Sequence, residues 1–281
     1  MMLLFAPVGI RGRIFVGNHA PFEVVSRISG GKNKMNKFTE HMTKLWSGIQ
    51  DNVVFILQFI GIVAGIILAA YLVELLIRKK NPVKEKVLTT RKIAVIGVMS
   101  AISAVLMLFE IPLPGVSFFY KLDFSDLPAL LCGLAYGPVA GVVTEAVKIL
   151  LNLLMDGTAT AFVGELANFI IGSVFVLTAT IIYHIKKTKK MAIIACVAAT
   201  LMITLFGTAF NGIYLLPKFA SFMLPMDAII ASGTAENSNV NSLMTFLLFC
   251  TLPTNLIKGV LVSGITIVLY QPLRPILKKT V

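Results

Sequence analysis

Three polar side chains near the end of an otherwise apolar sequence could bind a ligand. Asn211 lies inside an apolar segment, and Asn255 and Lys258 are three residues apart, so they share one face of a helix. An amide offers both a hydrogen-bond donor and an acceptor, and a lysine adds a charged donor, which suits the edge of a heterocycle or a sugar-like chain. A lone asparagine in a membrane helix usually bonds to a neighbouring helix. Three such groups together with an aromatic loop favour a ligand pocket.

Charged residues at membrane depth form a second group of candidates, because they are costly there unless they are paired. Asp123 and Asp126 stand at the start of a helix, where carboxylates cap free amides. Capping is the favoured interpretation of Asp126, whereas Asp123 suits a cap and the organisation of a ligand equally. Glu145 and Lys148 are three residues apart on one helix face, a spacing that favours an internal ion pair over a ligand site.

Asn168 is a weaker candidate at the outer end of another apolar segment. It shares a helix face with Glu165, three residues before it. Contact with a ligand and a hydrogen bond to a neighbouring helix fit this position equally.

Residues for catalysis or metal binding are not indicated. The Gly-Gly-Lys string at 30–32 lacks the remaining glycine of a phosphate-binding loop, so the chain is not expected to hydrolyse ATP itself. The three histidines have no carboxylate partner at metal spacing, and the three cysteines lie apart in apolar segments. We therefore predict no catalytic residue, no metal and no cofactor.

The composition is that of a membrane protein. Of 281 residues, 57% are hydrophobic and only 14% are charged, and the mean hydropathy is +0.89. A single anchor on a soluble domain would not give so high a mean. The 25 Lys and Arg against 13 Asp and Glu cluster between apolar stretches, so they indicate orientation in a lipid bilayer and not binding of nucleic acid.

Seven apolar segments divide the chain. They are residues 53–77, 93–111, the stretch 123–155 divided in two at Gly137-Pro138, 162–183, 191–216 and 243–270. We expect an all-α membrane protein in which one extra helix at 53–77 precedes a six-helix bundle at 93–275. A tail at 1–52, a basic linker at 78–92 and a short cytoplasmic tail at 276–281 complete the expected organisation.

Basic residues orient these segments, since cytoplasmic loops collect Lys and Arg. Seven fall in 78–92, four in 186–190 and three in 274–279, which places these segments inside and the loops 112–122, 156–161 and 217–242 outside. The tail at 1–50 carries seven Lys and Arg on the predicted outer side, against the rule. Translation starting at Met35 would remove most of them, and a genuine basic external tail is the alternative. The first residues do not have the pattern of a signal peptide.

Several strings resemble the substrate-binding S components of energy-coupling factor (ECF) vitamin transporters, in particular their riboflavin-specific branch. These strings are LDFSDLPAL at 122–130, GPVAG at 137–141, VKILLN at 147–152, GELANF at 164–169 and NLIKG at 255–259. The resemblance covers residues 93–275, and the first and last strings are its most specific part. It implies a six-helix bundle in the bacterial cell membrane that captures riboflavin outside the cell.

The resemblance also implies site residues and partners. The expected ligand-binding residues are Lys121, Leu122, Asp123, Asn168, Asn211, Asn255 and Lys258. A stripe of small residues, Gly97, Ala101 and Ala104, matches imperfectly the motif that docks the shared transmembrane coupling subunit. Two cytoplasmic ATPases would supply the energy. The alternatives are an S component for flavin mononucleotide (FMN) or another vitamin, or a proton-coupled secondary transporter, for which Glu145 is the candidate carboxylate.

Overall fold

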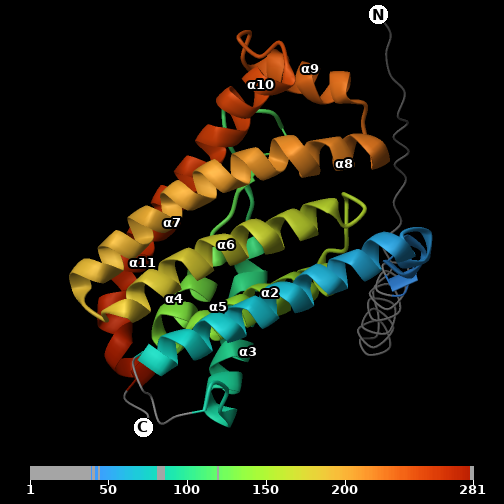
Figure 1. Cartoon of the computed structure of the whole chain (residues 1–281). Coiled ribbons are helices and arrows are strands. Elements are labelled where there is room, and N and C mark those ends of the chain that lie inside the picture. Colours follow the sequence, from blue (N-terminus) through green and yellow to red (C-terminus); the bar gives the residue numbers. More distant parts are fainter. Residues whose placement is uncertain (1–38, 40–41, 44, 81–85, 119, 279–281) are drawn as a thin grey trace, which may run out of the picture. The chain divides into compact units, whose positions relative to one another are not determined.

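The structure is a computed structural model that describes residues 39, 42–43, 45–80, 86–118 and 120–278. The chain divides into two units, 1–44 and 45–281, and the second contains every helix named below. In the described residues, six helices are long and apolar enough to cross a membrane, and Asp126–Tyr136 is a shorter apolar helix. The all-α membrane fold expected from the sequence is confirmed (Figure 1). The possible start at Met35 concerns residues outside the described part.

The helices follow the expected segments closely. Their bounds are α2 Val53–Lys80, α3 Thr90–Met107, α4 Asp126–Tyr136, α5 Pro138–Met155, α6 Val163–Ile185, α7 Lys189–Phe210, α8 Leu216–Phe222, α9 Met226–Glu236, α10 Leu243–Phe246 and α11 Leu252–Lys278. Two π-helical turns, η1 (Asn211–Leu215) and η2 (Leu247–Thr251), join α7 to α8 and α10 to α11. Because proline has no N–H to continue the regular ladder, Pro217 and Pro253 just beyond these turns explain their position.

A sharp turn separates α4 from α5, as the Gly-Pro pair predicts. Gly137 has a φ of 121°, which a residue with a side chain rarely adopts, and Pro138 opens the next helix. The turn is capped by α2, since Glu74 is buried and its Oε2 accepts a 3.1 Å hydrogen bond from the backbone N–H of Val139. Arg78 pairs with the other oxygen of Glu74 at 2.7 Å. The extra helix is therefore anchored to the bundle by a specific polar contact as well as by packing on α5 and α6.

The outer end contains more structure than the predicted loops. The loop after α3 includes a two-stranded antiparallel sheet, β1 (Ile111–Pro112) and β2 (Lys121–Leu122). The expected loop at 217–242 instead contains α8 and α9, and Ile229 of α9 is buried with Val116 and Phe246 in a small apolar cluster. Burial of this apolar face explains why the segment is helical.

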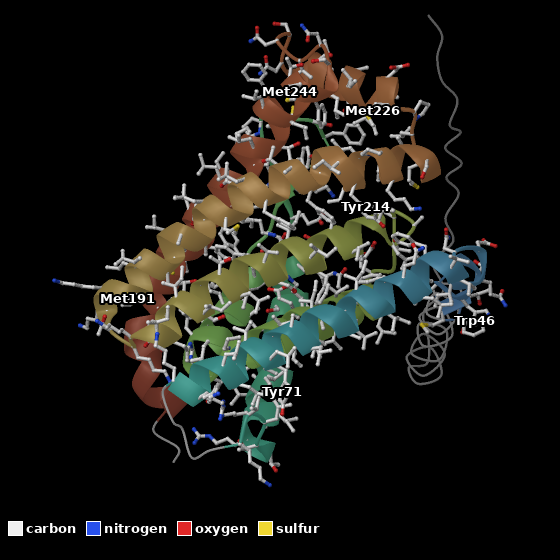
Figure 2. All side chains as sticks on the ribbon, in the orientation of Figure 1. Trp46, Tyr71, Met191, Tyr214, Met226 and Met244 are labelled. Carbon is white, nitrogen blue, oxygen red and sulfur yellow. The ribbon has the colours of Figure 1, made fainter. Side chains whose placement is uncertain are left out.

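The two ends of the bundle differ in charge. The basic end of α2 at 78–80 and the basic turn at 186–190 gather at one end (Figure 1). Figure 2 shows Met191, near the start of α7, at that end, and Tyr214 together with Met226 of α9 toward the other. This is the charge distribution on which the cytoplasmic assignment of the basic end depends.

Candidate functional site

A cavity opens near the outer end of the bundle. Its volume is about 1050 Å³, which includes space open to the surroundings, and it is lined by the loop after α3, the first turns of α6, the η1–α8 segment and the start of α11. This is close to the upper end of the roughly 300–1,000 Å³ range of small-molecule sites. The predicted ligand-binding residues on its wall are Lys121, Asp123, Asn168, Asn211, Asn255 and Lys258.

Leu122 is the predicted ligand-binding residue that does not line the cavity. It follows Lys121 on β2, and successive side chains of a strand point to opposite faces. Lys121 is exposed toward the cavity, where it pairs with Glu110, whereas Leu122 is buried. A contact between the Leu122 side chain and a ligand is thus not provided by this arrangement.

Lys258 begins a chain of buried ion pairs that runs from the cavity into the bundle. Its Nζ lies 3.0 Å from Asp123 Oδ2 and 3.0 Å from Asp126 Oδ2. Asp126 Oδ1 in turn accepts a 2.7 Å hydrogen bond from Lys148, which also pairs with Glu145. The predicted pairing of Glu145 with Lys148 is confirmed, and both side chains are fully buried.

The two aspartates have different roles from those favoured by the sequence. Asp126 was expected to cap α4, but its carboxylate pairs with Lys148 and Lys258 because the helices that carry these lysines pack around it. Asp123 instead organises the helix start, since its Oδ1 accepts a 2.8 Å hydrogen bond from the backbone N–H of Ser125. Its other oxygen faces Lys258. Asp123 therefore fixes both the helix start and the cavity lysine.

Gly172 of α6 provides the space for this chain of ion pairs. A Cβ atom at this position would lie 2.8 Å from Glu145 Oε2 and 3.1 Å from Asp126 Oδ1. Any larger residue would therefore press on two carboxylates that are already held by Lys148.

The two asparagines of the cavity differ in how their amides are satisfied. Asn211 donates a 2.7 Å hydrogen bond from Nδ2 to the carbonyl of Gly207, and its Oδ1 accepts from the Tyr120 hydroxyl at 3.2 Å. Asn255 is 8% exposed, and in the described part of the chain its Nδ2 has no hydrogen-bond partner. A buried donor without a partner is unfavourable, so Asn255 is suited to donate to a ligand in the cavity.

Tyr120 is a cavity residue that was not among the predicted contacts. The sequence indicated only an aromatic loop, and nothing in the spacing showed that this tyrosine meets residues 91 and 131 positions later. Burial raises the pKa of Tyr120, so its hydroxyl remains a neutral donor. Thr160 was also missed; it lines the cavity and donates to Glu165 at 2.9 Å.

The predicted docking stripe lies on α3, but its members face in different directions. Gly97 and Ala101 are exposed, whereas Ala104 is fully buried with Ser100. At 100° per residue, Ala104 lies on the side of the stripe nearer Ser100, and that side packs on the bundle. Only Gly97 and Ala101 are therefore available to a partner helix.

Comparisons with known proteins match the bundle. The family model "ECF transporter, substrate-specific component" matches residues 91–270. The Staphylococcus aureus riboflavin transporter RibU is 35% identical over 202 residues, which cover 72% of this chain and 97% of that protein. The Bacillus subtilis riboflavin transporter FmnP is 31% identical over 186 residues, covering 66% of this chain and 93% of that protein.

A solved structure is also similar to this chain. It is described as the S component of a bacterial ECF transporter, with a TM-score of 0.52 and 35% sequence identity. The similarity covers 66% of this chain and 97% of that one. The family match begins at residue 91, so α2 lies outside it.

Proposed function

The chain belongs to the substrate-specific components of ECF transporters, and from that premise we propose that it binds riboflavin outside the bacterial cell for ATP-driven uptake. It is a multi-pass protein of the cell membrane. The similarity to two riboflavin transporters supports the choice of vitamin. The proposed ligand site is the cavity, with Asp123, Asn211, Asn255 and Lys258 as its central polar residues.

The observation that carries this proposal is the unpartnered amide of Asn255 beside two other polar groups on one wall. A flavin ring is flat and mostly apolar, and one edge presents hydrogen-bond acceptors and a donor side by side. Asn255 supplies a free donor, and the amide of Asn211 is held in a fixed orientation. These groups suit that edge, with Lys258 as a charged donor nearby and apolar residues such as Ile171 and Leu215 against the ring.

The charges at the cavity favour riboflavin over its phosphorylated form. The lysines that line it are Lys121 and Lys258; the first pairs with Glu110, and the second with Asp123 and Asp126. A phosphate group would therefore have to compete with carboxylates for each cation, and it would face their negative charge. Riboflavin has no such group.

Transport requires partners in this proposal. The sequence has no phosphate-binding loop, so two cytoplasmic ATPases would act through a transmembrane coupling subunit. The exposed small residues of α3, Gly97 and Ala101, offer a surface on which a helix of that subunit could approach closely. The cavity lies on other elements, so ligand binding by this chain alone is expected.

Titration of purified, ligand-free protein in detergent tests the proposal. We expect riboflavin fluorescence to be quenched with one site per chain, because the ring enters a dry pocket. FMN should compete poorly for the reasons of charge given above. Absence of quenching, together with thermal stabilisation by another vitamin, would contradict the substrate. Equal affinity for FMN would contradict the argument from the paired lysines.

A further inference from the structure

Tyr120 connects the outer loop to both π-helical turns of the bundle. Its hydroxyl lies 3.2 Å from Asn211 Oδ1, at the start of η1, and 2.8 Å from Thr251 Oγ1, at the end of η2. Its ring packs against Phe246 with the centroids 6.0 Å apart. One side chain of the loop is therefore attached to two separate segments of the cavity wall.

The direction of these hydrogen bonds follows from Asn211. Its Nδ2 donates to the carbonyl of Gly207 at 2.7 Å, so its other amide atom, the acceptor oxygen, is the one that faces Tyr120. The tyrosine must then donate its hydroxyl proton to Asn211, and its oxygen is left to accept from Thr251. The resulting order of donors is Thr251, Tyr120, Asn211, and the final acceptor is Gly207.

Both ends of this chain carry proposed ligand contacts. Asn211 itself lines the cavity, and Thr251 lies four residues before Asn255, so these two share one face of the η2–α11 helix. The Gly207 position is also next to Asn255, because a Cβ there would lie 2.9 Å from Asn255 Nδ2. Movement of Tyr120 would therefore release both walls that hold the amides.

We propose that Tyr120 is a positioning residue for the ligand: its hydroxyl joins the two π-helical turns and so fixes Asn211 and the Asn255 face at the spacing that the ligand requires. This inference rests on the proposed binding of riboflavin. Asn211 keeps one amide hydrogen and one oxygen lone pair for the ligand, in an order set by the hydrogen bonds already made.

Tyr120→Phe tests the proposal, because it removes only the hydroxyl and keeps the ring beside Phe246. We expect riboflavin to bind about 10-fold more weakly, mainly through faster dissociation, since one buried hydrogen-bond partner is lost. Tyr214→Phe is the matched control: Tyr214 also lies in η1, but its ring stacks on Phe210 and it does not line the cavity. Its affinity should equal that of the wild type.

A double-mutant cycle with Asn211→Ala separates positioning from general loss of structure. If Tyr120 acts through Asn211, Tyr120→Phe should have much less effect on affinity in the Asn211→Ala background. Wild-type affinity in Tyr120→Phe, or equal losses in both backgrounds, would overturn the inference while leaving riboflavin binding intact. Failure of the wild-type protein to bind riboflavin would overturn the proposed function as well. Thermal unfolding of each variant identifies any that is misfolded, and Thr251→Val, which removes the other hydroxyl of the chain, should then weaken binding in its place.

Discussion

Replacing Asn255 with alanine should separate the stability of the protein from its affinity for riboflavin. In the ligand-free protein, the Asn255 Nδ2 is buried without a hydrogen-bond partner, so its removal takes away an unfavourable group and breaks no hydrogen bond of that atom. The space left by the shorter side chain joins the existing cavity. We therefore expect the ligand-free variant to unfold at the same temperature as the wild type or slightly above it.

Binding should respond in the opposite way. If Nδ2 donates to riboflavin, the variant leaves an acceptor of the ligand unpaired in a dry site, which costs about 1–3 kcal/mol. The dissociation constant should then rise by about 5- to 150-fold. Asn239→Ala is a suitable control, because Asn239 is exposed and does not line the cavity.

The measurement combines fluorescence titration with thermal unfolding, each on ligand-free protein in the same detergent. Unchanged riboflavin affinity in Asn255→Ala would refute the assignment of a ligand-binding donor. A marked fall in the stability of the ligand-free variant would also refute the reasoning, since it would mean that Asn255 holds helices together. The two quantities must move differently for the argument to stand.

Three further substitutions test the ion pairs and the docking surface. Lys258→Ala should lower both affinity and stability, the latter by up to about 3–5 kcal/mol, because buried carboxylates lose their cation; normal thermal unfolding would contradict this. Gly172→Ala should destabilise the protein by about 1–3 kcal/mol, since the added methyl presses on Glu145, and an unchanged or higher unfolding temperature would argue against a rigid ion-pair chain. Ala101→Trp should abolish uptake and co-purification of the coupling subunit while riboflavin binding persists, whereas Ala104→Trp should disrupt the bundle and lose binding too; uptake retained in Ala101→Trp would reject the docking surface.

The helices could be predicted from the sequence because hydropathy and the Gly-Pro turn determine them locally. The Glu145–Lys148 pair could also be predicted, since both residues lie on one helix. The remaining ion pairs could not. Lys148 and Asp126 are 22 positions apart and Lys258 and Asp123 are 135 apart, so their contacts depend on how the helices pack.

The direction in which α3 faces was equally hidden. In a soluble helix, polar residues mark the exposed side, but in a membrane both the lipid and the protein interior accept apolar residues. Ala101 and Ala104 therefore look alike in the sequence, although one is exposed and the other is buried. Tyr120 was hidden for a related reason: its partners lie on π-helical turns whose widened geometry depends on Pro217 and Pro253.

The position of α2 explains how a helix outside the family match can be present without obstructing the proposed function. It packs on α5 and α6, where Glu74 accepts a hydrogen bond from the first turn of α5, and the cavity-lining residues of the described chain include none from α2. Gly97 and Ala101 of α3 remain exposed with α2 in place. Both surfaces needed for transport, the ligand cavity and the docking face, are therefore left open. Because Glu74 contacts the turn that precedes Glu145 and Lys148, α2 also holds the helix that carries the inner end of the ion-pair chain.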